Sequence, residues 1–415
     1  MSLSVGSESM DFTSERFWAG TRAPLERSTG LHPAAYTSDD FFRVEQERLF
    51  ERSWVVVGCA AEAVEGRMLV RRVGDRSVVI VRDGDVIRAF YNSCRHRGTE
   101  LADGDCDVRN TIRCPYHRWG YGLDGSLKAR PFFDEVPRDD ADVADLGLIE
   151  VRVDAWGPLL FVCLDEATPP LSTWLGDLPE RMAGYRMDEW SIAAQQTLTI
   201  DANWKLITEN FQEYYHLRWV HPELAKVSRV EDHYRYQGPG MYIGQTTTPV
   251  SGDDRDDWLS MPPADGLDES DAVSGRHVAM FPNVMFSVLP NHVAVLHLQP
   301  LAPGRTLETL TWLVPPSAGD SPEIAQTRDF WVDLNDEDVD ICQRSQRGLT
   351  HGAIPPGPLA PRFEEPLHRF QNMVADLMCL DDLSDYRPPL GDEPGADERL
   401  GAGANPHPAA IDAPA

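Results

Sequence analysis

This chain of 415 residues has few cysteines and few basic residues. Its seven cysteines are too sparse, and odd in number, for a secreted scaffold held by disulfides, so we expect thiols that are reduced, buried or bound to metal. Lys and Arg number 38 against 67 Asp and Glu, which gives a formal net charge of −29. Because nucleic acids and anionic membrane surfaces are also negative, this charge argues against both as partners.

Long apolar runs and targeting signals are also missing. The longest apolar stretch near the N-terminus, Trp54 to Ala61, is far shorter than the roughly 18 to 20 residues that a membrane-spanning helix needs. The N-terminal segment contains Glu8, Asp11 and Glu15 but lacks the basic start and apolar run of a signal peptide. These features predict a cytoplasmic protein with no membrane partner.

Changes in residue composition along the chain predict two folded domains between irregular terminal segments. Residues 41–168 are predicted to form the first domain. A helix is expected at 39–50, and from Trp54 to about Asp165 short runs rich in β-branched residues, separated by turn signals, predict a small antiparallel β fold. Residues 1–40 are expected to form an N-terminal arm with little structure. The last segment, 384–415, is rich in Ala, Pro and Gly and predicts a flexible acidic tail.

Residues 169–383 are predicted to form the second domain. The Pro-rich stretch 169–179 is expected to be a linker, and the acidic segment 251–276 a lid or a disordered loop. Elsewhere helices and strands are grouped rather than alternating, which favours an α+β fold over alternating βαβ units. We expect helices at about 203–221 and 322–347, and strands at about 192–200, 278–289, 292–299 and 306–314.

Inside the β domain, two short segments each contain one cysteine and one histidine. Cys94 and His96 form a Cys-x-His motif, and Cys114 and His117 form a Cys-x-x-His motif further along. Two thiolates and two imidazoles suit a [2Fe–2S] cluster with sulfur ligands on one iron and nitrogen ligands on the other. A zinc site uses the same donors, but zinc fingers pair Cys with Cys and His with His. We therefore predict a Rieske-type cluster, and we expect Cys106, between the motifs, to be a buried thiol rather than a ligand.

A second pair of histidines lies in a predicted helix. Glu209, Glu213 and His216 fall at positions i, i+4 and i+7, so they share one face of it. His221 lies about 140° further round an ideal helix than His216, so regular geometry would separate the two imidazoles. Pro222 disfavours helical geometry at His221, and this distortion could bring the ring back towards a shared metal. Taken alone, the two histidines could also be unrelated surface residues.

A third metal ligand is expected from the acidic helix at 322–347. Its apolar residues form a stripe that includes Asp338, so this carboxylate should point inward, whereas Asp340 lies on another side. Two histidines and one carboxylate leave three positions open on a non-haem iron for oxygen and substrate. Asp338 is therefore predicted to complete a metal site with His216 and His221.

With both motifs present, the chain from about residue 38 to 380 resembles the large (α) subunit of Rieske non-haem iron ring-hydroxylating oxygenases. The resemblance implies an N-terminal antiparallel β Rieske [2Fe-2S] domain and a helix-grip catalytic domain, in which helices cover an antiparallel sheet. By similarity, the ligands of the cluster are Cys94 and Cys114 on one iron and His96 and His117 on the other. The ligands of a mononuclear Fe(II) would be His216, His221 and Asp338.

The same resemblance implies a role for Glu213. In this family a carboxylate three residues before the first iron histidine links cluster and iron across a subunit interface in a trimer. Many aromatic-ring dioxygenases have Asp there, whereas Glu213 is similar to the branch that attacks choline, carnitine and glycine betaine. Residues 281–286 and 301–306 are also similar to that branch. A homotrimer is therefore implied, in which Glu213 accepts a hydrogen bond from a cluster histidine of the neighbouring subunit.

The implied reaction is monooxygenation of a small molecule with O2, with a quaternary ammonium or betaine-type compound as the first choice of substrate. It would proceed by N-demethylation or C–H hydroxylation. Electrons would come from a separate NAD(P)H-dependent reductase or ferredoxin, because the glycines at 238–244 lack the spacing of a dinucleotide-binding motif. An aromatic-ring hydroxylase, dioxygenase or O-demethylase of the same family is the alternative. A Rieske electron-carrier protein without oxygenase activity is a second, less favoured alternative.

A trimethylammonium group favours aromatic faces and nearby negative charge. The acidic segment 251–276 could attract such a cation as a lid. Aromatic residues that could form the walls of its pocket, or could simply be core, are Tyr214, Trp219, Trp258, Phe281 and Phe286.

Overall fold

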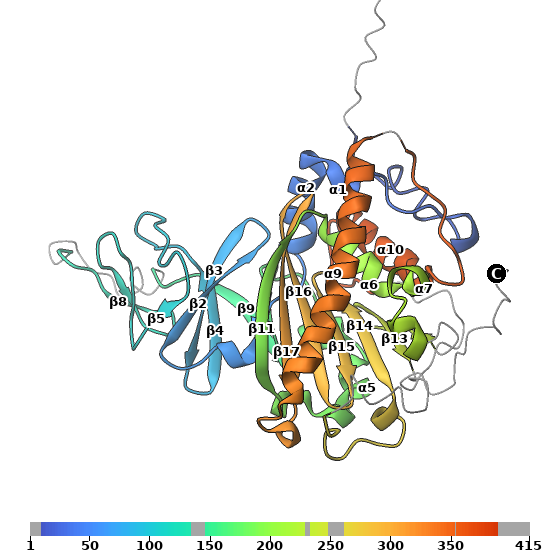
Figure 1. Ribbon diagram of the computed structural model, residues 1–415. Helices are drawn as coiled ribbons and strands as arrows, with labels where there is room; N and C mark the ends of the chain where they lie inside the picture. Colours follow the sequence, from blue (N-terminus) through green and yellow to red (C-terminus); the bar gives the residue numbers. More distant parts are fainter. Residues whose placement is uncertain (1–9, 134–145, 229–232, 248–260, 353, 389–415) are drawn as a thin grey trace, which may run out of the picture.

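The computed structural model describes residues 10–133, 146–228, 233–247, 261–352 and 354–388. They form two parts, each built around an antiparallel sheet (Figure 1). In the first part, strands and loops predominate, whereas in the second, helices cover a sheet. The fold is therefore α+β, as the sequence predicts.

The first part contains a seven-stranded sheet with the order β1-β10-β9-β4-β3-β2-β5 and a three-stranded sheet with the order β6-β7-β8. Runs of β-branched residues such as Val78 to Val81, which are fully buried, form the centre of the large sheet. Its strands are β1 (Val55–Cys59), β2 (Arg67–Val73), β3 (Arg76–Asp83), β4 (Val86–Tyr91), β5 (Cys106–Asp107), β9 (Glu150–Trp156) and β10 (Leu159–Cys163). The small sheet consists of β6 (Ile112–Arg113), β7 (Gly120–Tyr121) and β8 (Leu127–Ala129).

The second part is built on a seven-stranded sheet with the order β11-β17-β16-β15-β14-β13-β12. Its strands are β11 (Ser191–Ile200), β12 (His233–Tyr236), β13 (Tyr242–Thr247), β14 (Gly275–Met280), β15 (Val284–Leu289), β16 (His292–Ala302) and β17 (Arg305–Val314). Two of them, β12 and β13, are not predicted from the sequence, and the strand expected at 278–289 is in fact β14 and β15 with a turn between them. Buried apolar side chains from both parts join in one core.

Helices lie over this second sheet, and the longest, α9 (Glu323–Thr350), crosses in front of its strands (Figure 1). Contacts join α6 (Trp204–Gln212) to β13, β14 and β16, and α10 (Glu365–Cys379) to β13. The shorter helices are α1 (Ala34–Thr37), α2 (Asp39–Glu45), α4 (Leu171–Leu175), α5 (Leu178–Arg181), α7 (Leu217–Val220) and α8 (Leu224–Val227). A π-helical turn, Gln46–Phe50, continues α2, which agrees with the helix predicted at 39–50. Short 3-10 turns are Leu25–Arg27, Ala60–Glu62, Ala183–Tyr185, Met187–Glu189, Asp271–Val273 and Pro316–Ala318.

The N-terminal segment is packed from Phe12 onward, so the expectation of an arm with little structure is wrong. Trp18 is 1% exposed, and its indole Nε1 donates to the carbonyl of Phe12. The ring of Phe12 in turn meets Phe41 of α2 edge to face, at 5.1 Å between centroids. Such interlocked aromatic rings bury a large apolar area, and they tie the segment to the helices of the second part.

The Pro-rich stretch 169–179 is also folded, contrary to the expected linker. It forms α4 and the start of α5, and the side chains of Leu171, Trp174 and Leu178 are buried in the core. Proline suits the first turn of a helix, where its missing N–H is not needed. Within the acidic segment 251–276, the described residues 261–276 are folded: Met261 and Asp271 are buried, and β14 begins at Gly275, so a disordered loop is wrong there. The expectations for residues 251–260 and 389–415 lie outside the described residues.

All seven cysteines lie among the described residues, and none of them forms a disulfide, as expected. Cys106 is exposed rather than buried, because it lies on the short strand β5 at the edge of its sheet, so that expectation is wrong. Among the described helices, none is both long and apolar enough to cross a lipid bilayer.

A fully buried ion pair anchors α6 to α2. Lys205 Nζ lies 2.5 Å from Glu45 Oε1, both side chains are 0% exposed, and the indole of Trp204 donates to the other carboxylate oxygen at 3.0 Å. Burial lowers the pKa of Lys205 and raises that of Glu45, while the charge of each partner opposes the shift. Each charge is therefore tolerated only because the other is present.

Replacing Lys205 with Met should destabilise the protein by about 3–5 kcal/mol, since it leaves the Glu45 carboxylate buried without a partner. The free energy of unfolding from urea titrations measures this cost. The double variant Lys205→Met/Glu45→Gln serves as the control and should recover much of the loss. Equal destabilisation of the single and double variants would show that packing, not the charge pair, stabilises this contact.

Candidate functional site

The two Cys/His motifs form two loops with matching backbone hydrogen bonds. In the first loop, the carbonyl of Cys94 accepts from the N–H of Gly98, and the N–H of Cys94 donates to the carbonyl of Thr99. In the second loop, Cys114 forms the same two bonds with Arg118 and Trp119. Gly98 and Arg118 occupy the same place in the two loops, and both adopt positive φ angles, +73° and +59°. The loops are therefore two copies of one turn.

This arrangement separates the thiols from the imidazoles. Cys94 and Cys114 are each 2% exposed, whereas His96 is half-buried and His117 is exposed. The two imidazole rings meet edge to face, with 4.8 Å between centroids and an interplanar angle of 69°. Two inner sulfurs and two outer nitrogens suit a [2Fe–2S] cluster whose irons differ in ligands, and this donor set fits the predicted Rieske-type centre.

Aromatic residues that the motif does not reveal support these loops. The ring of Trp119 stacks on His96 at 4.8 Å with an interplanar angle of 7°. Tyr121 Oη lies 3.2 Å from Cys94 Sγ and accepts a hydrogen bond from the N–H of Arg95. Because its oxygen already accepts from Arg95, the hydroxyl of Tyr121 is free to donate to the sulfur. Burial and the Cys94 contact both raise the pKa of Tyr121, so the hydroxyl stays protonated.

The second predicted metal site, with His216, His221 and Asp338, forms where the predicted helix breaks. α6 ends at Gln212, and Glu213 is extended (φ −119°, ψ 156°), so a new short helix, α7, begins after His216. The single helix expected over 203–221 is therefore wrong, and so is the shared face with Glu209. That carboxyl is buried elsewhere, where it accepts hydrogen bonds from Tyr36 and Gln371.

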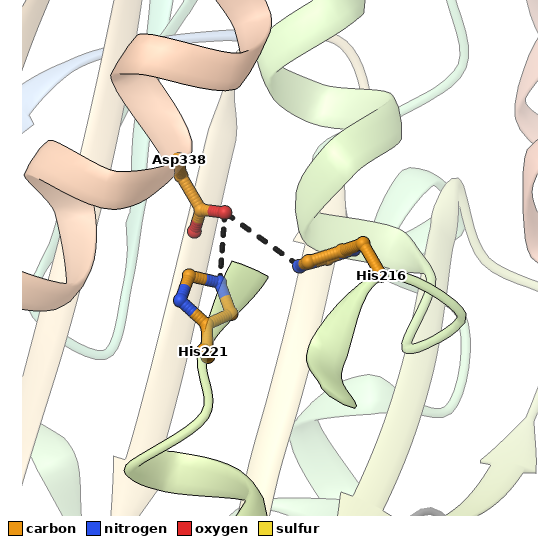
Figure 2. A group of neighbouring side chains, drawn as sticks. All are labelled: His216, His221 and Asp338. Atoms are coloured by element: carbon orange, nitrogen blue, oxygen red, sulfur yellow. Dashed lines mark hydrogen bonds and ion pairs between the residues drawn. The ribbon is translucent and has the colours of Figure 1, made fainter. Parts of the chain in front are cut away.

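The break brings the three predicted ligands together (Figure 2). His221 Nε2 lies 2.9 Å from Asp338 Oδ1, and His216 Nε2 lies 3.6 Å from the same oxygen. One ligand atom from each residue falls within 4.8 Å of the other two. Asp340, by contrast, pairs with Arg344 at 2.7 Å on the exposed side of α9, as the apolar stripe predicts. The geometry thus fits one ion held by two imidazoles and a carboxylate.

Carboxylates hold the outer nitrogen of each imidazole. His216 Nδ1 lies 2.5 Å from Glu213 Oε1, and His221 Nδ1 lies 2.7 Å from Glu337 Oε2. These contacts keep a proton on Nδ1 and leave Nε2 as the ligating atom of both rings. Burial lowers the pKa of His221, but hydrogen bonds and charges from Asp338 and Glu337 outweigh this effect and raise the pKa. The raised pKa shows that the electrostatic field at this site favours a cation.

Asn210 and Glu337 belong to this site although the sequence gives little sign of them. The amide Nδ2 of Asn210 lies 3.0 Å from Asp338 Oδ1 and 3.2 Å from His216 Nε2. Its carbonyl oxygen accepts from Cys342 Sγ at 3.4 Å. The only sequence signal for Glu337 is its position beside Asp338, in a helix where most carboxylates are solvated.

A cavity of about 110 Å³ opens next to the three ligands. Aromatic side chains among its walls are Phe211, Tyr214, Trp312, Phe330 and Trp331. Of the predicted aromatics that the structure describes, only Tyr214 lines it. Phe281 and Phe286 are core residues, Trp219 is 69% exposed, and Trp258 lies outside the described residues. The predicted walls were largely wrong because the pocket is formed by residues far apart in the sequence.

Both parts of the chain match known protein families. Residues 53–140 match the Rieske [2Fe-2S] domain, and residues 187–379 match the ring hydroxylating alpha subunit (catalytic domain). The glycine betaine monooxygenase oxygenase subunit of Chromohalobacter salexigens is 30% identical over 383 residues, which cover 83% of this chain and 84% of that protein.

Two further proteins are similar over most of the chain. The chloroplastic choline monooxygenase of Spinacia oleracea is 27% identical over 347 residues, which cover 81% of this chain and 75% of that protein. The crystal structure of the quaternary ammonium Rieske monooxygenase CntA in complex with substrate L-carnitine matches with a TM-score of 0.72 and 26% identity. This match covers 88% of this chain and 99% of the other.

Asp338→Ala should remove one iron per chain and leave the [2Fe–2S] cluster intact, because only the carboxylate of the second site is lost. Iron content should fall from about three to about two atoms per chain, with an unchanged visible spectrum of the cluster. Asp340→Asn is the matched control on the same helix and should keep all three. Full iron content in the Asp338 variant would exclude this residue as a ligand.

Tyr121→Phe should lower the reduction potential of the cluster, because a hydrogen bond to sulfur stabilises the more negative, reduced state. A bond worth about 1 kcal/mol corresponds to about 40 mV for a one-electron couple. Spectroscopic redox titration measures the shift. An unchanged potential would mean that Tyr121 only packs against Cys94.

Proposed function

The chain belongs to the α subunits of Rieske-type ring-hydroxylating oxygenases, and from this premise we propose that it monooxygenates a small quaternary ammonium compound. It is an oxidoreductase of the Rieske oxygenase family, with a [2Fe–2S] cluster and a mononuclear iron as cofactors. The substrate class, the ligands of each centre and the assembly state are our proposals.

The observation that carries the substrate proposal is the cavity beside the three ligands. Its walls include the aromatic side chains of Trp312, Phe330 and Trp331, and the carboxylates of Glu213 and Asp338 line the same cavity. Aromatic faces with nearby negative charge attract a trimethylammonium cation. The names of the similar proteins, which refer to glycine betaine, choline and a quaternary ammonium carnitine complex, support the same class.

In this proposal Cys94, Cys114, His96 and His117 hold the cluster, and His216, His221 and Asp338 hold the iron. When bound, these groups supply an electron and activate O2. Glu213 and Glu337 orient the two imidazoles through Nδ1. The apolar walls exclude water and hold an N-methyl C–H bond towards the metal end of the cavity.

The products follow from the balance of this reaction. One oxygen atom enters an N-methyl C–H bond, and the other leaves as water with two electrons and two protons. The resulting N-hydroxymethyl compound breaks at the C–N bond to give formaldehyde, a proton and the demethylated amine. Electrons would come from a separate NAD(P)H-dependent reductase or a ferredoxin. Gly238 and Gly240 instead allow close packing against Asp177 and the backbone of Leu175.

We also propose a homotrimer in which the cluster of one subunit faces the iron of the next. Exposed aromatic residues lie near both centres. Tyr116, beside His117, is 56% exposed, and near the iron ligands Tyr215 and Trp219 are 46% and 69% exposed. A contact between these surfaces would bury them. It would also bring a cluster histidine to Glu213, whose Oε1 bonds to His216 Nδ1 among the described residues and has a further lone pair to accept a second hydrogen bond.

The iron-loaded protein with a surrogate reductase should consume O2 and release about one formaldehyde per O2 with an N-demethylated substrate. A panel of glycine betaine, carnitine, choline and benzoate tests this by oxygen electrode and formaldehyde assay. Choline and carnitine can give aldehyde products instead, so O2 uptake is read beside formaldehyde. Asp338→Ala should abolish both. Coupled uptake with benzoate alone would move the assignment to the aromatic-ring hydroxylases.

A further inference from the structure

The floor of the cavity is a row of side chains that crosses the sheet. Strand register places Gln245 of β13 opposite His277 of β14, His277 opposite Ser287 of β15, and Ser287 opposite Ala294 of β16. Ala294 in turn pairs with Trp312 of β17, and all five residues line the cavity. Neighbouring strands are about 4.8 Å apart. Gln245, His277 and Ser287 therefore form the polar end of the row, and Trp312 forms its apolar end.

The polar members of this row form hydrogen bonds within it. His277 Nδ1 lies 2.8 Å from Ser287 Oγ, and Gln245 Nε2 donates to the carbonyl of Phe211 at 3.3 Å. The amide oxygen Gln245 Oε1 is buried, and among the residues that the structure describes it has no hydrogen-bond partner. Burying polar groups on a sheet face costs free energy that apolar residues would avoid. A ligand that uses them would explain their presence.

This end of the cavity is uncharged. Burial, with smaller effects from His233 and Arg276, lowers the pKa of His277 to about 3, so the imidazole is neutral near pH 7. Arg276 lies on the opposite face of the sheet, where it pairs with Asp271 at 2.7 Å. Among the described residues that line the cavity there is no Lys or Arg. Hydrogen bonding rather than ion pairing must therefore act here.

We propose that His277, Ser287 and Gln245 form a subsite for an oxygen-bearing end group of the substrate, which orients the molecule so that its ammonium end faces the iron ligands. The inference rests on the proposed function and deepens it, because it adds a neutral hydrogen-bonding group on the sheet to the aromatic and acidic side chains that line the same cavity. A hydroxyl or a carboxylate oxygen could each bind at the polar end, and the test distinguishes them.

The experiment compares three trimethylammonium compounds with the iron-loaded protein and a surrogate reductase. Choline carries a hydroxyl, glycine betaine carries a carboxylate, and propyltrimethylammonium carries a methyl group in place of the oxygen. Values of kcat/KM come from O2 uptake and dissociation constants from calorimetry. Neutral hydrogen bonds should favour one of the oxygen compounds over the methyl analogue by about fivefold to tenfold.

His277→Phe and Ser287→Ala should each reduce this preference towards unity, and whichever oxygen compound loses it identifies the end group. Two variants are used in case one does not fold, and the cluster spectrum checks folding. Thr311→Val is the control, because Thr311 is a buried hydroxyl that pairs with Gln195 on the opposite face of the same sheet. It should keep the wild-type preference.

The outcomes separate this inference from the proposed function. Turnover without any preference for an oxygen end group, or a preference that survives in both variants, overturns the subsite and leaves the proposed function standing. Failure of the wild-type protein to bind or turn over any of the three compounds overturns both. A preference lost in Thr311→Val as well would assign the effect to the sheet as a whole and would also overturn the subsite.

Discussion

The predicted iron site depends on the carboxylate of Glu213, which lies at the end of α6 and holds the loop that follows it. One of its oxygens accepts from the backbone N–H groups of Tyr215 and His216, and the other contacts the imidazole of His216. In a continuous helix His216 and His221 would diverge by about 140°. The break removes that divergence, and α9 then brings Asp338 against both rings. The buried pair of Lys205 and Glu45 anchors the helix from which this loop departs.

The sequence identifies the candidate ligands because their chemistry is specific and their spacing is local. Two short motifs that each combine Cys and His supply the donor set of a [2Fe–2S] cluster, and Pro222 marks the distortion at His221. The supporting residues are harder to predict. Glu337 is one carboxylate among many on α9, and Asn210 reaches Asp338 only after two helices pack together. The polar floor of the cavity requires strand register, and β13, which carries Gln245, lacks a pattern that identifies it as a strand.

Fold prediction succeeds and fails for similar reasons. Runs such as Val78 to Val81 identify strands because β-branched residues suit a pleated, buried surface. The N-terminal segment has no helical or strand periodicity that a sequence could reveal. Its position is fixed instead by isolated aromatic contacts of Trp18 and Phe12. The stretch 169–179 has the composition of a linker, but its prolines are compatible with helix starts, and its Leu and Trp side chains complete the core.

The burial of Cys94 and Cys114 beneath His96 and His117 has a consequence for maturation of the protein. A preformed cluster can reach two thiols that are 2% exposed only while the two loops are apart. Insertion must therefore accompany closure of the loops, and the finished cluster should resist exchange. Of the predicted iron ligands, His216 and Asp338 are 17% and 31% exposed, whereas His221 is 3% exposed. Two of the three side chains are thus open to a metal ion from solvent in the folded chain, so filling this site does not require the loop closure that the cluster requires.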